Sequence, residues 1–412
     1  MYKKAYTAQK YYATDNEEIA NRMGYLERQM RNKVSIRFHK LRNGFFPKAV
    51  KRLSLYLLGN GVTLDDETKA KIDKRLDNKI IIAAINACVD GVNWGFPDLD
   101  ELVFFRATEF IPLVDERTSK PMVGVRFWQI DDQKPMYIEL YEIDGITEYK
   151  TNNSNGLEET APKRPYRQTV QRDAFSETVI NGENYDVFPI FPLYANELKT
   201  SELSPGIKAL IDAYDFISSD LVDGITLVEG IYWVIKNYGG DDIGQLLAEL
   251  QQLKATYTED EAGADNHIVE IPFQAKQVAL DLLETRMYSD WLLPTEMRTG
   301  GARAVTATEI KAAREDMDIK ADLLEWQVAE FIENVLLLKG IDMLIPSFKR
   351  RTMTNDTETV NNIATKLSGG WIDADEAIRA DPTIPDEEKA ELLKRIDLLM
   401  TGIPADDDEG LD

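Results

Sequence analysis

The 412-residue sequence predicts an α+β protein in which helical and strand regions are segregated along the chain. Apolar residues recur at steps of three and four over long stretches, most clearly from about residue 306 to 338. Short β-branched and aromatic runs dominate between about residues 101 and 194, and turn residues separate them. With 43% hydrophobic residues, the chain is expected to build two to four units with cores of their own.

The region before residue 100 is predicted to be mostly helical. Helices are expected over 16–31, over 43–64 with a stop at Gly59-Asn60-Gly61, and over 66–96. The last of these has a predicted buried face that contains Ile80, Ala84, Ala87 and Cys88. The following region predicts four to six antiparallel strands, with residues 151–166 as a polar hairpin tip or loop.

The second half returns to helices. Ser204-Pro205 predicts a helix start, because Ser accepts an early backbone N–H and Pro suits the first helical position. Two strands, 229–237 and 266–273, are expected to flank a short helix in a small acidic insert. An amphipathic helix (276–294), a Gly-Gly loop and a helix of roughly 50 Å (306–338) follow. The tail predicts two or three short helices, with Asp373 and Asp386 as caps.

The helix after Ser204 carries acids without compensating bases. Its apolar stripe runs from Ile207 to Ile225, and Asp212, Asp215, Ser219 and Asp223 fall on the opposite face. No Lys or Arg occurs between Lys208 and Lys236. Exposed helices usually mix both signs, because like charges four residues apart repel. Two interpretations remain: an ordinary solvated face, or a surface that faces a polyanion without holding it.

The charge is unevenly distributed. The net charge is −24, yet residues 1–60 carry 13 Lys/Arg against 4 Asp/Glu, a net of +9, and the remainder carries −33. The basic, aromatic stretch 24–52 fits either nucleic acid phosphates or an acidic surface of another copy, and self-assembly is the more economical partner. The single Cys88 suits a reducing compartment, and no secretory signal or membrane-spanning run is expected.

The search for catalytic chemistry yields no site. The two histidines, His39 and His267, lie far apart in sequence, and no HExxH or CxxC pattern predicts a metal. No phosphate-binding loop or nucleophile elbow occurs, and Cys88 falls in an apolar helix where thiols are inert. Trp94, Trp128, Trp291 and Trp326 fall on apolar stripes and are expected in the core. We expect no enzymatic activity, no cofactor and no metal.

The order of parts resembles the portal proteins of tailed bacteriophages of the siphophage type. The best pieces are residues 43–64, 137–150 and above all 188–223, "FPIFPLYANELKTSELSPGIKALIDAYDFISSDLVD". Within that last stretch the residues that fit the family pattern are Pro192, Asn196, Ser201, Leu203, Ile207, Lys208, Ile211, Asp212, Tyr214, Asp215 and Asp220. The alternative is an oligomeric capsid-associated adaptor or scaffold protein that does not conduct DNA.

The resemblance implies a division of the chain into the parts of a portal fold. These are a wing (1–203), a first stem helix (204–228), a clip (229–274), a second stem helix (275–293), a tunnel loop (294–306), a long wing and crown helix (307–340), a crown (341–400) and an acidic tail (401–412).

The resemblance also implies a function. Such proteins form a ring, twelve copies in the virion, at one capsid vertex, and double-stranded DNA passes through it during packaging and ejection. The implied DNA-facing tunnel-loop residues are Arg298, Thr299, Gly300, Gly301 and Arg303, and the implied channel face of the stem is Asp212, Asp215, Ser219 and Asp223. The implied clip residues that face the terminase are Asp241, Asp242, Glu249, Glu259, Asp260 and Glu261. Head-completion, capsid and scaffolding proteins are further implied partners, in the virion and in the host cytoplasm during assembly, and no membrane is implied.

Overall fold

The structure is a computed structural model of residues 1–412 and contains two compact units, residues 1–350 and 351–412. It describes residues 2–30, 38–99, 101–118, 120–131, 133–152, 156–173, 176–228, 232–235, 264–267, 273–294, 307–341, 344–350, 356–381, 383–384 and 386–401. Within these residues no helix is long and apolar enough to cross a membrane.

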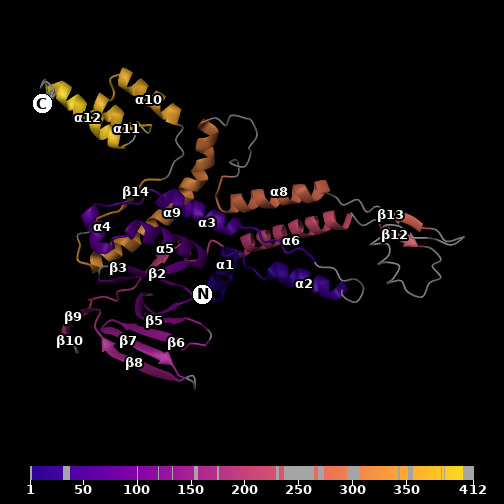
Figure 1. The fold of residues 1–412 in the computed structure, drawn as a ribbon, viewed down its shortest axis with the longest axis horizontal. Coiled ribbons are helices and arrows are strands. Elements are labelled where there is room, and N and C mark those ends of the chain that lie inside the picture. The colour runs from indigo at the N-terminus through magenta and orange to yellow at the C-terminus, as the bar shows by residue number, and fades with distance from the viewer. Residues whose placement is uncertain are drawn as a thin grey trace, which may run out of the picture. The chain divides into compact units, whose positions relative to one another are not determined.

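The first unit begins with five helices (Figure 1). They are α1 (Tyr2–Tyr12), α2 (Glu18–Met30), α3 (Phe45–Leu58), α4 (Asp66–Ile72) and α5 (Leu76–Asp90). The predicted helix over 66–96 was too long, because α5 ends at Gly91 in a left-handed conformation with φ of 92°. Glycine adopts that conformation without steric cost, so the chain can turn there into a strand.

Antiparallel strands follow, as predicted, but more than the four to six expected. One sheet has the order β11-β2-β3, a five-stranded sheet has the order β4-β5-β6-β7-β8, and β9 pairs with β10. The strands are β2 (Val92–Asp98), β3 (Glu101–Arg106), β4 (Phe110–Val114), β5 (Pro121–Gln129), β6 (Met136–Glu142), β7 (Gly145–Thr151), β8 (Leu157–Arg164), β9 (Arg167–Asp173), β10 (Ser176–Glu183) and β11 (Phe191–Tyr194). Residues 157–164, predicted as part of a loop, form the edge strand β8 because they pair with β7.

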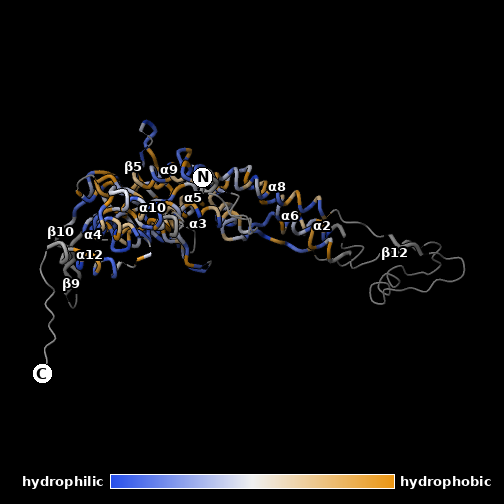
Figure 2. The backbone as a smooth tube through the Cα atoms, turned by 90° about the horizontal axis from the view of Figure 1, so that it is seen from above, coloured by the Kyte–Doolittle hydropathy of each residue, from blue (hydrophilic) through white to orange (hydrophobic). Residues whose placement is uncertain are grey.

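Two antiparallel helices then flank a small hairpin. Helix α6 (Pro205–Val228) packs against α8 (Phe273–Asp290), and β12 (Tyr232–Ile235) pairs with β13 (Ala264–His267) between them in the chain. Orange and blue segments alternate along α6 in Figure 2, as expected for an amphipathic helix. Helix α8, predicted to be amphipathic, has almost no difference in hydrophobicity between its faces. The long helix α9 (Ala307–Leu338) matches its predicted bounds closely, and β14 (Ser347–Phe348) closes the unit by pairing with β1 (Val62–Thr63).

The second unit is helical, with α10 (Asp356–Ser368), α11 (Ala374–Ala380) and α12 (Asp386–Thr401). The predicted cap at Asp373 is confirmed, since its carboxylate accepts a hydrogen bond from the backbone N–H of Glu376 at 2.8 Å. Asp386 is the first residue of α12 rather than a residue before it.

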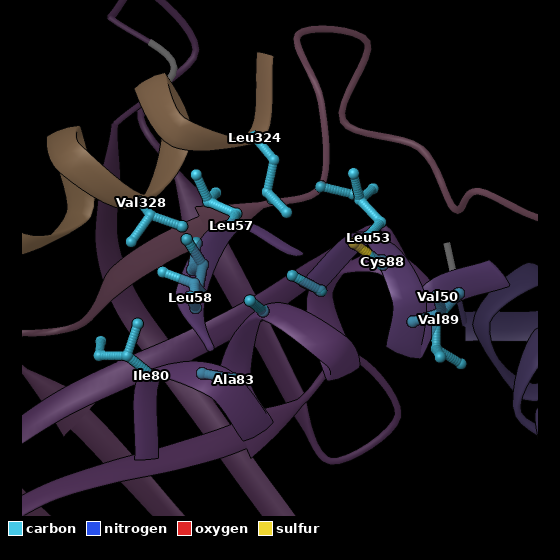
Figure 3. Packing of buried hydrophobic residues seen from close by; sticks show 14 of the residues in the cluster. Val50, Leu53, Leu57, Leu58, Ile80, Ala83, Cys88, Val89, Leu324 and Val328 are labelled. Atoms are coloured by element: carbon cyan, nitrogen blue, oxygen red, sulfur yellow. The ribbon is translucent and has the colours of Figure 1, made fainter. Parts of the chain in front are cut away.

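The main core of the first unit is formed where α3, α5 and α9 meet. Leu57 of α3, Ile80 and Cys88 of α5, and Val328 of α9 are fully buried there (Figure 3). A second, aromatic cluster includes Trp94, Phe105, Phe110 and Tyr141 and joins the two larger sheets. Trp94 and Trp291 are buried as predicted. Trp128, on β5, is only partly buried, and Trp326 is 66% exposed, because it lies on the face of α9 opposite the core.

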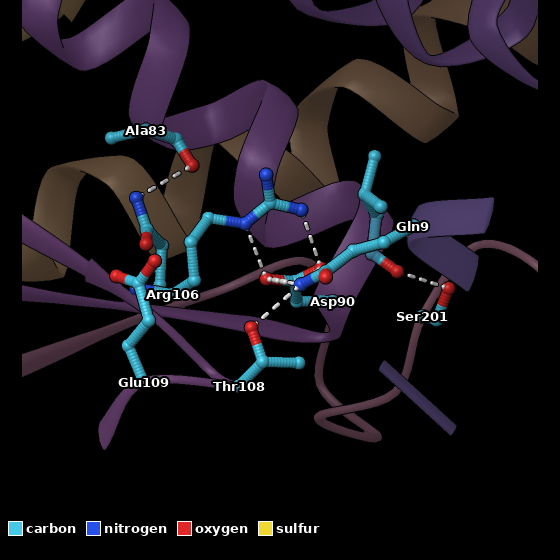
Figure 4. Close-up of polar contacts among 9 residues, drawn as sticks. Gln9, Ala83, Asp90, Arg106, Thr108, Glu109 and Ser201 are labelled. Carbon is cyan, nitrogen blue, oxygen red and sulfur yellow. Dashed lines mark hydrogen bonds and ion pairs between the residues drawn. The ribbon is translucent and has the colours of Figure 1, made fainter. Parts of the chain in front are cut away.

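An ion pair with a buried carboxylate connects three elements of this unit (Figure 4). The guanidinium of Arg106, on β3, donates two hydrogen bonds of 2.7 Å to the carboxylate of Asp90, at the end of α5. The amide of Gln9, on α1, donates to the same carboxylate and to the hydroxyl of Thr108. The Asp90 side chain has no exposed surface, so these donors offset the cost of burying its charge.

Glycine at position 95 permits the close approach of β2 and α9. A methyl group on Gly95 would lie 2.4 Å from Cζ of the buried Phe331. We therefore expect Gly95→Ala to lower the free energy of unfolding by about 2 kcal/mol, as overpacking of a filled core does. Urea unfolding followed by tryptophan fluorescence measures this change.

The matched control is Gly24→Ala, which adds the same methyl group inside α2, where nothing lies within 4 Å. That variant should gain about 0.5–1 kcal/mol from helix propensity. Equal unfolding midpoints for the two variants would contradict the packing role of Gly95.

Candidate functional site

The candidate site is the polar face of α6, the face that the sequence singles out. The helix starts as predicted, with the backbone N–H of Ile207 donating to the hydroxyl of Ser204 at 3.2 Å. Ile207 and Ile211, at the start of the apolar stripe, are buried in the main core. The opposite face therefore points away from that core.

An extended segment of the same chain lies along this polar face. We call residues 38–43 the strap, and three of its alternate backbone N–H groups donate to side chains of α6. They run from Asn43 to Asp215 at 3.0 Å, from Leu41 to Ser219 at 3.0 Å, and from His39 to Asp223 at 3.0 Å. Two residues of extended chain advance ~6.6 Å and four helical residues advance ~6.0 Å, so the two repeats stay in register.

Side chains strengthen this contact at both ends of the strap. The amide of Asn43 donates to Asp215 at 2.8 Å, and Nδ1 of His39 lies 2.6 Å from an oxygen of Asp223. Asn16, before α2, donates a further bond of 3.3 Å to Asp215. The hydroxyl of Ser219 donates to the backbone carbonyl of Asp215, so both of its hydrogen-bonding functions are used.

The strap buries the residues that it contacts. Asp215 and Ser219 are 0% exposed, and Asp223 is 6% exposed. Burial raises the pKa of Asp215 above its usual value, although the donors from Asn43 and Asn16 act in the opposite direction. A buried carboxylate with several donors is a structural anchor for the chain that supplies them.

The predicted open acidic face is therefore wrong at Asp215, Ser219 and Asp223. Their carboxylate and hydroxyl oxygens are occupied by the strap and cannot line an aqueous bore. The sequence shows that this face of α6 has no basic residue on the helix itself. The hydrogen-bond donors for its acidic side chains come from the strap, more than 170 residues earlier in the chain. Helical periodicity alone does not reveal such a partner.

Asp212 differs from the other three residues. Its carboxylate accepts a bond from Nζ of Lys208, one turn earlier on α6, at 2.6 Å, and one from the hydroxyl of Tyr11. Burial, with the nearby Asp212 carboxylate, raises the pKa of Tyr11 to about 12. The charge of Asp212 is thus balanced by a lysine on the same helix.

Basic residues of the stretch 24–52 form ion pairs with acidic residues of the same chain. Its described part includes the strap, whose Lys40 and Arg42 pair with Glu27 and Asp15. His39, for which the sequence predicts no metal-binding partner, is the strap's contact with Asp223. Lys40 and Arg42 of the strap therefore need no acidic surface of a second copy.

A second junction joins α6 to its neighbours through Glu202. Its backbone N–H donates to the carbonyl of Cys88 at 2.9 Å, and its carbonyl accepts from the indole of Trp291 at 3.1 Å. Its carboxylate accepts from Asn196 at 3.0 Å and from Nζ of Lys320 at 2.5 Å. One buried residue thereby links α5, the segment before α6, the end of α8 and the middle of α9.

The described residues offer no group of three or more His, Cys, Asp or Glu side chains that could hold a metal ion. The one cysteine, Cys88, is fully buried, and burial raises the pKa of its thiol well above the ordinary range.

Comparison with known proteins identifies the family. Residues 1–397 match the family described as phage portal protein, SPP1 Gp6-like. The chain belongs to this family. The portal protein of Bacillus phage SPP1 is 24% identical, over 98% of this chain and 86% of the relative. The portal protein of Clostridium phage phiCD119 is 28% identical, over 51% of this chain and 48% of the relative.

Solved structures give a more distant likeness. A chain from the virion of a native gene transfer agent particle has 12% identity and a TM-score of 0.41, over 85% of this chain and 90% of that chain. A chain from the neck of the empty particle has 12% identity and a TM-score of 0.40, over 89% of this chain and 92% of that chain.

Two sets of predicted portal residues lie outside the described residues. They are Arg298, Thr299, Gly300, Gly301 and Arg303 of the tunnel loop, and Asp241, Asp242, Glu249, Glu259, Asp260 and Glu261 of the clip. Sequence reasoning missed Glu202 and Asn43 as organising residues of this portal family member. The sequence did contain one signal for Asn43. Positions 39, 41 and 43 are two residues apart, and in an extended chain they advance about as far as helix positions 215, 219 and 223, which are four residues apart.

The hydrogen bonds of the strap predict how a substitution at Asp215 changes the free energy of unfolding. Asp215→Ala removes the acceptor for Asn43 and Asn16 and leaves buried donors unpaired, so we expect a loss of about 3 kcal/mol of unfolding free energy. Backbone amides of Leu41 and Asn43 should also exchange with deuterium faster, as hydrogen exchange with mass spectrometry will detect.

Asp220→Ala is the control on the same helix. Asp220 is half-exposed and pairs with Lys276 at 2.7 Å, so its loss should change stability by less than about 0.5 kcal/mol. If both variants lose the same stability, or if exchange in the strap stays unchanged, the anchoring role of Asp215 is wrong.

Proposed function

We propose that this portal family member closes into a ring, with twelve copies at one capsid vertex, and that double-stranded DNA passes through its centre during packaging and ejection. The observation that carries the proposal is the family match over residues 1–397, with two relatives that are named portal proteins. The alternative of an adaptor or scaffold that does not conduct DNA is not favoured, because that match spans nearly the whole chain.

The proposed parts follow the chain. Residues 1–203 form the wing, 204–228 and 275–293 the stem, 229–274 the clip, 294–306 the tunnel loop, and 307–340 with 341–400 the long helix and the crown. The antiparallel packing of α6 on α8, with the β12–β13 hairpin between them in the chain, supports the assignment of stem and clip. Residues 401–412 form the acidic tail.

The charges that repel DNA in the proposed conduit are not those on the polar face of α6. A conduit should not bind its cargo, because each phosphate that a cation neutralises adds affinity through counterion release. The repulsion must come from charges that remain in water, and a net charge of −24 per copy supplies many. Within the clip, Asp241, Asp242, Glu249, Glu259, Asp260 and Glu261 are the proposed acids, and they also form the proposed surface for the terminase.

The tunnel loop is the proposed exception to this repulsion. Arg298 and Arg303 flank Thr299, Gly300 and Gly301, so the loop combines two phosphate-binding cations with a flexible centre. Transient contacts of this kind are compatible with sliding, because each one is exposed to solvent and salt.

The proposed partners are copies of the chain, transiently bound DNA, the terminase, head-completion proteins, and capsid and scaffolding proteins. The protein would then reside in the virion at the capsid vertex, and in the host cytoplasm during assembly. We propose no catalytic step, no cofactor and no membrane partner, in keeping with a structural family.

Native mass spectrometry and negative-stain microscopy of the purified full chain test the ring. The expected result is an assembly of about a dozen copies with an open centre. A chain that stays monomeric at every concentration and salt condition, including with scaffolding protein added, would contradict the proposal.

A double variant tests the tunnel loop. Arg298→Ala with Arg303→Ala should leave the ring intact and reduce packaged DNA by about tenfold or more, because both proposed phosphate contacts are lost. The measurement is nuclease-protected DNA in a packaging assay. Lys254→Ala, which removes a positive charge outside the loop, is the control, and wild-type packaging by the double variant would remove the role of the loop.

A further inference from the structure

Helix α9 carries a second stripe, apolar at its centre and acidic at its ends, on the face opposite its buried residues. The residues Glu315, Ile319, Leu323, Trp326, Glu330 and Glu333 recur at steps of four and three, and we call them the α9 stripe. They span ~27 Å of one helix face. The buried residues Met317, Ala321, Leu324 and Val328 lie on the other face.

The centre of the α9 stripe is unusually apolar for a surface. Trp326 is 66% exposed and Ile319 is 50% exposed, while Leu323 is partly buried. Exposed Trp residues beside aliphatic neighbours are typical of binding surfaces, because Trp contributes most to interfaces when it is desolvated. The stripe therefore has the composition of an interface centre with acidic ends.

A surface of opposite character lies on α1 and α3. Tyr2 and Tyr6 stack with ring centroids 6.2 Å apart and are 50% and 46% exposed. Lys3 lies beside them on α1, and Lys48 and Lys51 are exposed on α3. Nζ of Lys51 lies 5.7 Å from the ring of Tyr12, so α3 approaches α1 at the C-terminal end of α1. We call Tyr2, Lys3, Tyr6, Lys48 and Lys51 the N-terminal patch.

The charges of the two surfaces lack partners within the described part of the chain. Neither Glu315, Glu330 nor Glu333 has a lysine or arginine within ion-pair distance there. The same holds for Lys3, Lys48 and Lys51 with respect to carboxylates. By contrast, Asp318 and Asp322, which lie beside the stripe, pair with Arg350.

We propose that the α9 stripe of one copy docks on the N-terminal patch of the next copy. The proposal rests on the ring proposed above and names the surfaces that close it. Charge decides the pairing: two α9 stripes would set acids against acids, and two N-terminal patches would set lysines against lysines. Only the mixed pairing brings aromatic rings onto Trp326 and lysines onto Glu330 and Glu333.

This pairing has the symmetry that a ring requires. The two surfaces differ, so the contact is head-to-tail, and head-to-tail contacts close into rings when the rotation allows. It also accounts for the uneven charge, since residues 1–60 carry a net +9 in a chain whose net charge is −24. The lysines beside the indole would add cation–π attraction to the ion pairs.

Cysteine cross-linking tests the contact directly, because Cys88 is fully buried and unreactive. Thr7→Cys stands one turn after Lys3, and Gln327→Cys stands between Leu323 and Glu330, so neither variant removes a residue of the two surfaces. The two single variants are mixed before assembly and treated with a short bifunctional maleimide. A covalent dimer is expected in the mixture, with neither variant dimerising alone.

The control mixture is Gln327→Cys with Thr160→Cys, an exposed position on β8, and it should give no dimer. Rings that form without the Thr7–Gln327 dimer would overturn the docking and leave the proposed function standing. A wild-type chain that never assembles would instead contradict the proposed function, and the docking with it.

Charge exchange provides an independent test. Glu330→Lys with Glu333→Lys should raise the concentration for half-assembly by about tenfold, and Lys48→Glu with Lys51→Glu should do the same. The chain with all four changes should assemble close to the wild-type concentration, because opposite charges face each other again. Glu158→Lys with Glu159→Lys, the same change on β8, should have no effect. Failure of the fourfold variant to recover, while each pair weakens assembly, would overturn the docking.

Discussion

Alternate backbone N–H groups of the strap donate hydrogen bonds to the polar side chains of α6, and much of the first unit depends on these bonds. Asp215 and Ser219 lose all contact with water, which is tolerable only because each receives donors in return. The strap leads directly into α3, whose Phe45 and Phe46 are buried in the main core. The position of α6 is thus fixed by the same segment that starts the central helix of that core.

Glu202 complements the strap at the other end of α6. Its four hydrogen bonds reach α5, the segment before α6, the residue just after α8 and the middle of α9, so these elements share one buried residue. Trp291 lies only a few residues before the proposed tunnel loop, and Lys320 lies on the helix that follows that loop. A displacement of either flank of that loop would therefore have to break a buried bond to Glu202, which gives the proposed conduit a rigid frame around its loop.

The strap also changes how a conduit formed by this family member would treat DNA. Asp215 and Asp223 of α6 are buried under the strap and cannot meet phosphates directly, so the repulsion falls to exposed acids elsewhere in the chain. The charged groups on α9 and on α1 with α3 that have no ion-pair partner among the described residues are opposite in sign, as the proposed contact between copies requires. The acids of α6 would then stabilise the fold of one chain, and the acids of α9 would bind the next copy.

The sequence alone determined the elements whose signal is local. Ser204-Pro205 marked the start of α6, the nine-turn periodicity marked α9, Asp373 marked a cap, and residues 188–223 carried the family. Local signals suffice there, because helix starts and apolar stripes depend on neighbours within a few residues.

Only the tertiary structure decided what the acidic face of α6 does. Its partners, His39, Leu41 and Asn43, are separated from it by more than 170 residues, and their donors are mostly backbone N–H groups that every residue carries. The same holds for Trp326, whose place on an apolar stripe did not reveal that its side of α9 faces solvent. Periodicity defines the faces of a helix, but only the folded chain determines what lies against each face.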